Sequence, residues 1–166
     1  MTAHVLEINA GGLTNDDFAE VTSYDSSSAL PFHTIDAAVD GLVYGMIYKL
    51  RYRAENALGP GGYSDIVLVA LTAVPSAPAT PVREISGSTE TSIAVSWESM
   101  QPDPALEGNS ITGYRLYAAR EKSNIYSLVF DGIGFPQIKR AVVSGLMPGD
   151  LYDFKVSASN FNGEGQ

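Results

Sequence analysis

Hydrophobic and polar residues alternate strictly near the end of the chain. Tyr152, Phe154, Val156 and Ala158 are separated by charged or small polar residues, and the stretch 47–56 has a similar pattern in the first half. A period of two residues places one set of side chains on each face of an extended strand. Both stretches are therefore predicted to be β-strands with one buried and one solvent-facing side.

Similar alternation, interrupted by turns rich in glycine, proline and aspartate, predicts strands along the rest of the chain. In the first half the predicted strands span 4–8, 18–24, 47–56 and 63–72, and the segment 32–38 leads into another. In the second half they span 82–85, 92–97, 111–119, 126–130, 139–143 and 151–159. Sixteen glycines and nine prolines among these strands favour an all-β class.

The two halves carry copies of one motif, 104 residues apart. Leu42, Gly45 and Tyr48 of the first copy match Leu146, Gly149 and Tyr152 of the second, without a gap. In each copy a turn containing glycine leads to a tyrosine at the start of a strand. This order predicts a tyrosine corner, in which the ring is buried and the hydroxyl bonds back to the connecting backbone. An ordinary core tyrosine in another β-fold is the alternative.

The second copy resembles the last strands of a fibronectin type III domain. The residues that carry this resemblance are Leu146, Pro148, Gly149, Tyr152, Phe154, Val156, Ala158, Asn160, Gly163 and Gly165. Upstream, 92–97 resembles the second strand of that family, with its core Trp97, and 111–116 resembles the third. The resemblance implies tandem immunoglobulin-like β-sandwiches of fibronectin type III type.

The resemblance also implies where the domains begin and end. The first domain, 1–74, is expected to lack the strands A and B of the family, and the second, 82–166, to lack strand G. Three prolines in 75–81 favour a short, semi-rigid linker between them. Two tandem repeats truncated at their outer ends imply a stretch of a longer chain, or sandwiches completed by another chain.

The core expected from this alignment is large and apolar. Its predicted members are Trp97, Tyr114, Leu146, Tyr152 and Val156 in the second domain and Leu42 and Tyr48 in the first. Ala54 and Ala158 are expected at matching, buried positions. Because the first domain lacks two strands, its inner sheet face is expected to be largely uncovered at Leu6, Ile8, Tyr48, Leu50 and Tyr52.

Composition excludes several functions. The net charge of −9 argues against a nucleic-acid partner, which requires a basic surface. No apolar run is long enough to insert into a membrane, and no targeting signal begins the sequence. With no cysteine and two separate histidines, a zinc site is not expected. The acidic loops around Asp16 and Asp103 lack calcium-loop spacing and are interpreted as solvated.

A basic stripe is the one candidate interaction surface. Lys49, Arg51 and Arg53 lie on the polar face of the strand 47–56. The stripe could bind a polyanion, but it is short and the chain around it is acidic. Cross-strand pairing with Glu7, on the same face of the neighbouring strand, is the favoured interpretation.

Without a catalytic motif, the sequence predicts neither an enzyme nor a cofactor. The resemblance implies a non-catalytic structural, adhesive or protein-interaction segment of a larger protein. Its partners would be other protein chains or neighbouring repeats, in an extracellular, cell-surface or cilium-associated setting. The alternative is a spacer module in a secreted enzyme whose catalytic domain lies outside this segment.

Overall fold

The computed structural model describes residues 3–26, 32–101, 103 and 105–166. The chain divides into two compact units: unit 1 comprises Met1–Thr72 with Ala105–Gly108, and unit 2 comprises Ala73–Pro104 with Asn109–Gln166. The described residues form β-strands and two short 3-10 helices, Ile85–Gly87 and Glu107–Asn109. The predicted all-β class is thus confirmed. Within that described part, no helix has the length and apolar character to cross a membrane.

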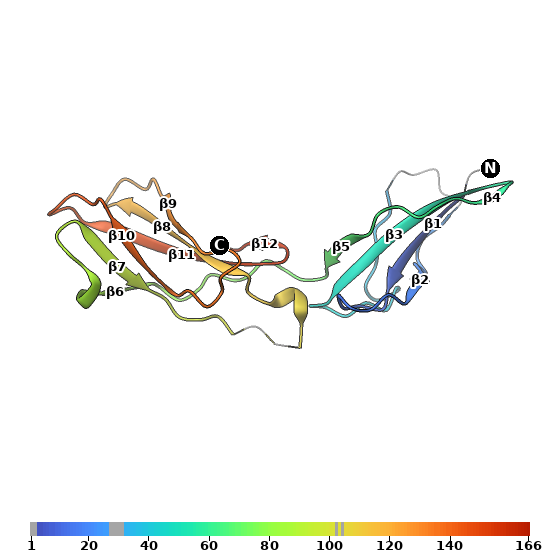
Figure 1. Ribbon diagram of the computed structural model, residues 1–166, viewed down its shortest axis with the longest axis horizontal. Helices are drawn as coiled ribbons and strands as arrows, with labels where there is room; N and C mark the ends of the chain where they lie inside the picture. Colours follow the sequence, from blue (N-terminus) through green and yellow to red (C-terminus); the bar gives the residue numbers. More distant parts are fainter. Residues whose placement is uncertain (1–2, 27–31, 102, 104) are drawn as a thin grey trace. The chain divides into compact units, whose positions relative to one another are not determined.

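Unit 1 contains one antiparallel sheet (Figure 1). Its strands are, in spatial order, β2 (Phe18–Glu20), β1 (Ala3–Asn9), β3 (Ile47–Asn56) and β4 (Gly59–Pro60), with β5 (Val67–Ala70) also pairing with β3. The segment 32–38 has no strand. Asp36 instead accepts hydrogen bonds from the backbone N–H groups of Ala38 and Val39, at 2.9 and 3.2 Å. Such local side-chain bonds close a turn and compete with strand pairing.

Among the described residues of unit 1, the inner face of this sheet is covered at one end. Ile8, Val21 and Tyr48 are buried. Half-buried residues from the sheet and from the loops pack around them: Leu6, Tyr24, Ile35, Leu42, Met46, Leu50 and Leu71. The prediction that Tyr48 belongs to the core is therefore confirmed, and the expectation that Ile8 and Tyr48 would be uncovered was wrong, because residues of the loops 21–24 and 35–46 pack against them.

At the other end of the face the expected burial of Ala54 was also wrong. Ala54 is exposed, whereas its counterpart Ala158 is completely buried in unit 2. Tyr52 is 57% exposed. The difference lies in what packs against each sheet: unit 2 has a second sheet over this position, and unit 1 has none among its described residues.

Unit 2 is a β-sandwich of two antiparallel sheets (Figure 1). One sheet has the order β10 (Arg140–Ser144), β7 (Ser92–Ser96), β6 (Val82–Glu84). The other has the order β12 (Gly163–Glu164), β11 (Tyr152–Asn160), β8 (Gly113–Arg120), β9 (Ser127–Asp131). Every one of the six strands predicted after residue 81 is present, within two residues at each end, because the alternation of their side chains matches the two-layer packing.

The core of unit 2 lies between these sheets. Its buried members are Val95, Trp97, Tyr114, Leu116, Ala141, Val143, Val156 and Ala158. Trp97 is 6% exposed and its ring is tilted against those of Tyr114 and Phe130, at centroid distances of 6.1 and 5.8 Å. Leu146 is half-buried against this core, and Tyr152 is half-buried outside it.

The tyrosine corner is present in both copies of the motif. The backbone N–H of Val43 donates to the Tyr48 hydroxyl at 2.6 Å, and that of Met147 donates to the Tyr152 hydroxyl at 3.0 Å. The turn glycines also match, with φ of +88° at Gly45 and +84° at Gly149. A positive φ is readily adopted only by glycine. The sequence repeat is therefore also a repeat of local geometry.

Candidate interaction surfaces

The described residues contain no group of three or more His, Cys, Asp or Glu side chains that could hold a metal ion. Polar side chains gather instead on the outer faces of the sheets, where strand alternation presents them to solvent. One such cluster lies on the sheet of unit 1, and another on the β8–β9–β11 sheet of unit 2. These two clusters, and a groove beside β11, are the candidate interaction surfaces.

In unit 1 the basic stripe is neutralised within the sheet. β1 pairs with β3 so that Glu7 lies opposite Arg51. The Arg51 guanidinium contacts the Glu7 carboxylate at 2.6 Å, which confirms the predicted cross-strand pair. Lys49 pairs with Asp16 at 2.7 Å, and Arg53 pairs with Glu55 at 3.0 Å. The three cations of the stripe thus each have an acidic partner.

Two aromatic rings complete this cluster. The Arg51 guanidinium lies 3.9 Å from the ring centroid of Phe18 and 3.9 Å from that of Tyr63, so it is held between two π faces. The Tyr63 hydroxyl donates to the Glu7 carboxylate at 2.6 Å. Burial acts to raise the pKa of Glu7, but the Tyr63 hydrogen bond and the Arg51 guanidinium outweigh it and hold that pKa below its usual value.

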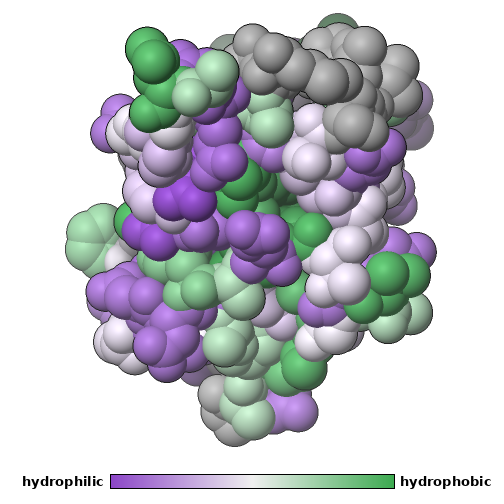
Figure 2. Space-filling model, turned by 90° about the vertical axis from the view of Figure 1, so that its right-hand side faces the viewer, coloured by the Kyte–Doolittle hydropathy of each residue, from purple (hydrophilic) through white to green (hydrophobic). Residues whose placement is uncertain are grey.

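A closed network of this kind is a poor site for a polyanion, because a bound anion would have to displace the acidic partners. On the face shown in Figure 2, hydrophilic and hydrophobic residues are interspersed. Sequence reasoning found Glu7 and the three cations from strand alternation, but it missed Phe18 and Tyr63. Both aromatic residues come from other segments, and only the folded sheet brings them to Arg51.

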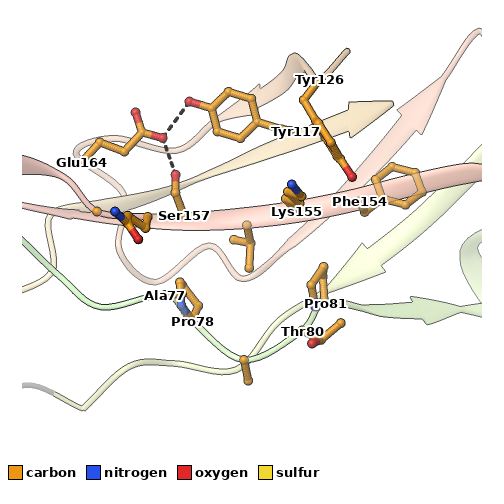
Figure 3. A pocket seen from close by; sticks show the side chains of 14 residues that line it. Ala77, Pro78, Thr80, Pro81, Tyr117, Tyr126, Phe154, Lys155, Ser157 and Glu164 are labelled. Atoms are coloured by element: carbon orange, nitrogen blue, oxygen red, sulfur yellow. Dashed lines mark hydrogen bonds between the residues drawn. The ribbon is translucent and has the colours of Figure 1, made fainter. Parts of the chain in front are cut away.

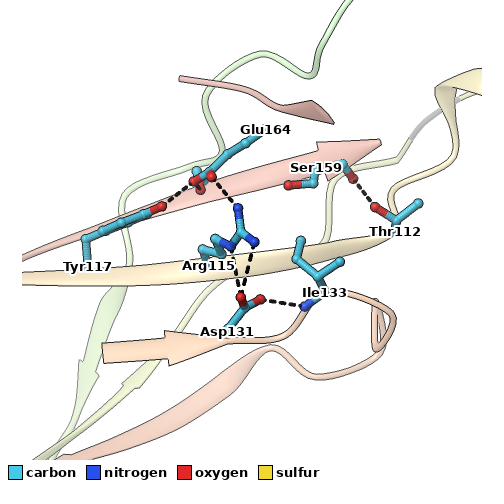
Figure 4. A network of polar contacts seen from close by, with 8 residues as sticks. Thr112, Arg115, Tyr117, Asp131, Ile133, Ser159 and Glu164 are labelled. Atoms are coloured by element: carbon cyan, nitrogen blue, oxygen red, sulfur yellow. Dashed lines mark hydrogen bonds and ion pairs between the residues drawn. The ribbon is translucent and has the colours of Figure 1, made fainter. Parts of the chain in front are cut away.

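In unit 2 the outer face of the sheet carries a network centred on Glu164 (Figure 4). The Arg115 guanidinium pairs with Glu164 at 2.7 Å and with Asp131 at 3.2 Å. The hydroxyl of Tyr117 donates to the Glu164 carboxylate at 2.6 Å, and the hydroxyl of Ser157 donates to it as well. These contacts connect β8, β9, β11 and β12. Sequence reasoning did not single out this network, because only the sheet order brings these four strands together.

The environment of Glu164 also determines how it titrates. Burial acts to raise the pKa of its carboxyl, but the hydrogen bonds from Ser157 and Tyr117 and the charge of Arg115 lower it below the usual value. The hydrogen bond to Glu164 in turn raises the pKa of the Tyr117 hydroxyl. The network is therefore stabilised by an ionised Glu164.

We expect Glu164→Gln to destabilise unit 2 by about 1 kcal/mol near pH 7, because the amide replaces a charged acceptor of several hydrogen bonds. A carboxyl with a lowered folded-state pKa stabilises the fold above its unfolded pKa and loses this effect as the pH falls through the folded value. The stabilities of the wild type and the variant should therefore converge as the pH falls below the usual pKa of a glutamate, about 4.3. Urea unfolding of both proteins from neutral to acidic pH measures this convergence. A difference in unfolding free energy that stays constant with pH would contradict the prediction.

A groove lies along one edge of β11 (Figure 3). Its volume is about 510 Å³. One wall is the segment 77–81, which was predicted to be a linker, and the other is 154–157 of β11. Tyr117 and Tyr126 also line it, and the Lys155 ammonium lies 4.0 Å from the Tyr126 ring centroid. The groove thus has a mixed lining of proline, aromatic and polar side chains.

Residues 76–166 match the family model of the fibronectin type III domain. The human netrin receptor DCC is 34% identical over 138 residues, which cover 76% of this chain and 9% of the receptor. Human neogenin is 33% identical over 131 residues, with 76% and 8% covered. Bovine receptor-type tyrosine-protein phosphatase F is 30% identical over 121 residues, with 71% and 6% covered.

The chain spans less than a tenth of the length of these curated relatives. Among solved structures, that of the chicken CNTN1 FN1-FN3 domains aligns with a TM-score of 0.55 at 18% identity. The alignment covers 99% of this chain and 53% of that one, which shows a common fold. Since the family model matches more than half of the residues, with the sandwich and the tyrosine corner in the matched part, the chain belongs to the fibronectin type III family.

Proposed function

We propose that this chain is a non-catalytic adhesion or protein-interaction segment of a larger protein, built from two fibronectin type III units in tandem. The observation that carries the proposal is family membership combined with relatives that are named as receptors. Its partners would be other protein chains or neighbouring repeats, and its location the cell surface or the extracellular space.

Two observations support a second unit of the same type before residue 75. The alignment with the human netrin receptor covers 76% of the chain, so it must include residues that precede the matched family model at 76–166. The tyrosine corner and the turn glycines of unit 2 recur in unit 1. We therefore propose domains at 1–74 and 82–166, joined by 75–81.

In unit 1 we propose the face around Lys49, Arg51 and Arg53 as a contact surface for protein. Because each cation already has an acidic partner, this face offers aromatic rings and balanced charge rather than net positive charge. Mixed aromatic and arginine surfaces are typical of protein–protein contacts.

The alternative, a spacer in a secreted enzyme, has less support. Of the three relatives described above, one is named as an enzyme, and that phosphatase is named as receptor-type.

Binding to cell surfaces tests the proposal directly. We expect the purified chain, multimerised on a streptavidin tetramer, to bind saturably to at least one line in a panel of cultured cells. Treating those cells with protease beforehand should abolish the binding, because the partner is a protein. An unrelated β-sandwich of similar charge, multimerised in the same way, is the control. Binding that survives protease treatment, or that equals the control on every line, would contradict the proposal.

A further inference from the structure

The sequence contains one asparagine that is followed directly by glycine, at Asn162–Gly163. The pair lies at the turn between β11 and β12, and Asn162 is exposed. A Cβ at Gly163 would meet no atom within 4 Å, so the space around this peptide bond is open. Because glycine has no side chain to hinder a close approach, its backbone nitrogen can reach the side-chain amide carbon of the residue before it. This arrangement allows the chain to modify itself.

The matching turn in unit 1 shows that this exposure belongs to the turn itself. At the offset of 104 residues, Leu58–Gly59 corresponds to Asn162–Gly163. The two glycines have almost the same φ, +126° and +125°. Leu58 is 98% exposed, although β5 follows it and pairs with β3. Residue 162 is thus exposed because it stands at the tip of a turn, and unit 1 has a leucine where unit 2 has the reactive amide.

Release of the Gly163 amide depends on how firmly β12 is held. Gly163 pairs with Asn160 of β11, and β12 contains only two residues. Glu164, directly after the pair, is bonded to the Arg115 guanidinium at 2.7 Å and to the Tyr117 hydroxyl at 2.6 Å. A short stretch of pairing opens locally far more often than the whole domain unfolds. The contacts of Glu164 therefore set how often the Gly163 nitrogen is free to react.

We propose that Asn162–Gly163 is a site of spontaneous deamidation and that the Glu164 network controls its rate. The Gly163 nitrogen loses its proton and bonds to Cγ of Asn162, and Nδ2 of Asn162 takes up a proton and leaves as ammonia. Water then opens the cyclic imide at either of its carbonyl carbons, which gives aspartate or isoaspartate. The reaction consumes water and needs no other reactant. This inference goes beyond the proposed cell-surface role and does not depend on it.

The isoaspartate product breaks the network that restrained its formation. Isoaspartate adds a methylene group to the main chain between Asn162 and Gly163. The pairs Asn160–Gly163 and Ser159–Glu164 depend on a turn of fixed length. Since the longer turn cannot keep this register, the Glu164 carboxylate is drawn away from Arg115. The modification thus changes the charged outer face of unit 2 permanently.

Incubation in water labelled with heavy oxygen tests the site. The complete chain is kept at mildly alkaline pH and is then digested with trypsin in ordinary water, so that only conversion on the intact chain is labelled. Fragmentation of the peptide that begins at Val156 in a mass spectrometer locates the label. Heavy oxygen should accumulate at residue 162. It should stay at background at Asn160, which is 7% exposed and precedes Phe161.

Two variants and a peptide test the control by Glu164. Glu164→Gln should convert about 5-fold faster, because the hydrogen bonds of the carboxylate are weakened. Glu90→Gln, a change of the same kind at an exposed residue outside the network, should match the wild type. A synthetic peptide of residues 156–166 gives the rate without the fold, which should exceed that of both variants. The proposal is overturned if residue 162 takes up no more label than Asn160, if the wild type converts as fast as the peptide, or if Glu164→Gln is no faster than Glu90→Gln.

Discussion

Trp97→Ala is expected to destabilise unit 2 by about 3–5 kcal/mol, the range measured for truncating a large buried aromatic residue. The indole is 6% exposed and contacts the rings of Tyr114 and Phe130 from the opposite sheet. Its removal leaves a cavity between the two layers, which β7 and β8 cannot close without breaking their own pairing. Since a domain has about 5–15 kcal/mol of unfolding free energy in total, this single change removes a large share of the stability of unit 2.

Two further variants of unit 2 make this prediction specific. The indole Nε1 of Trp97 is buried and has no hydrogen-bond partner among the described residues, so Trp97→Phe loses apolar volume but no bond. It should cost clearly less than the alanine variant. Val142→Ala removes a half-exposed side chain from the neighbouring β10 and should cost less than about 1 kcal/mol.

Denaturant unfolding measures these differences. It should be followed by far-ultraviolet circular dichroism, because Trp97 is the only tryptophan and its fluorescence is lost in Trp97→Ala and in Trp97→Phe. Hydrogen exchange at β8 and β11 then assigns the change to unit 2. A Trp97→Ala variant that is no less stable than Val142→Ala would contradict the packing described here.

Gly113→Ala is expected to be the second most damaging change, at about 3 kcal/mol, the upper part of the range for overpacking. A Cβ at Gly113 would lie 2.2 Å from the carbonyl oxygen of Gly132 and 2.6 Å from the Cα of Ile133. Both are backbone atoms, so no side chain can move aside. The turn after β9 would have to separate from β8, with loss of the bond from Gly132 N–H to the Tyr114 carbonyl.

Gly62→Ala is the matched control. A Cβ there meets no atom within 4 Å and the backbone does not have a positive φ. It should leave the free energy of unfolding unchanged or slightly raised, because alanine restricts the unfolded chain more than glycine does. Thermal unfolding compares the midpoints of both variants with that of the wild type. Equal midpoints for Gly113→Ala and the wild type would refute the steric argument.

The sequence predicted some of the residues that form the candidate surfaces. The alternation of 4–8 and 47–56 placed Glu7 and Arg51 on one face, and the structure pairs them at 2.6 Å. The contact of two aromatic rings with Arg51 could not be predicted from the sequence, because Phe18 and Tyr63 come from segments that only the order of strands in the sheet brings together. The Glu164 network was missed for the same reason: its members come from β8, β9, β11 and β12.

The sequence by itself determined the all-β class, nearly every strand of unit 2 and the tyrosine corners. These features follow from local periodicity and from turn residues that act within a few positions, such as Gly149 before Tyr152. Only the tertiary structure decided which faces are covered. Ala54 and Ala158 occupy matching positions in the two copies of the repeated motif. Ala158 is buried beneath a second sheet, whereas Ala54 is exposed. Burial depends on what packs against a residue, and a strand's own alternation carries no information about its neighbours in space.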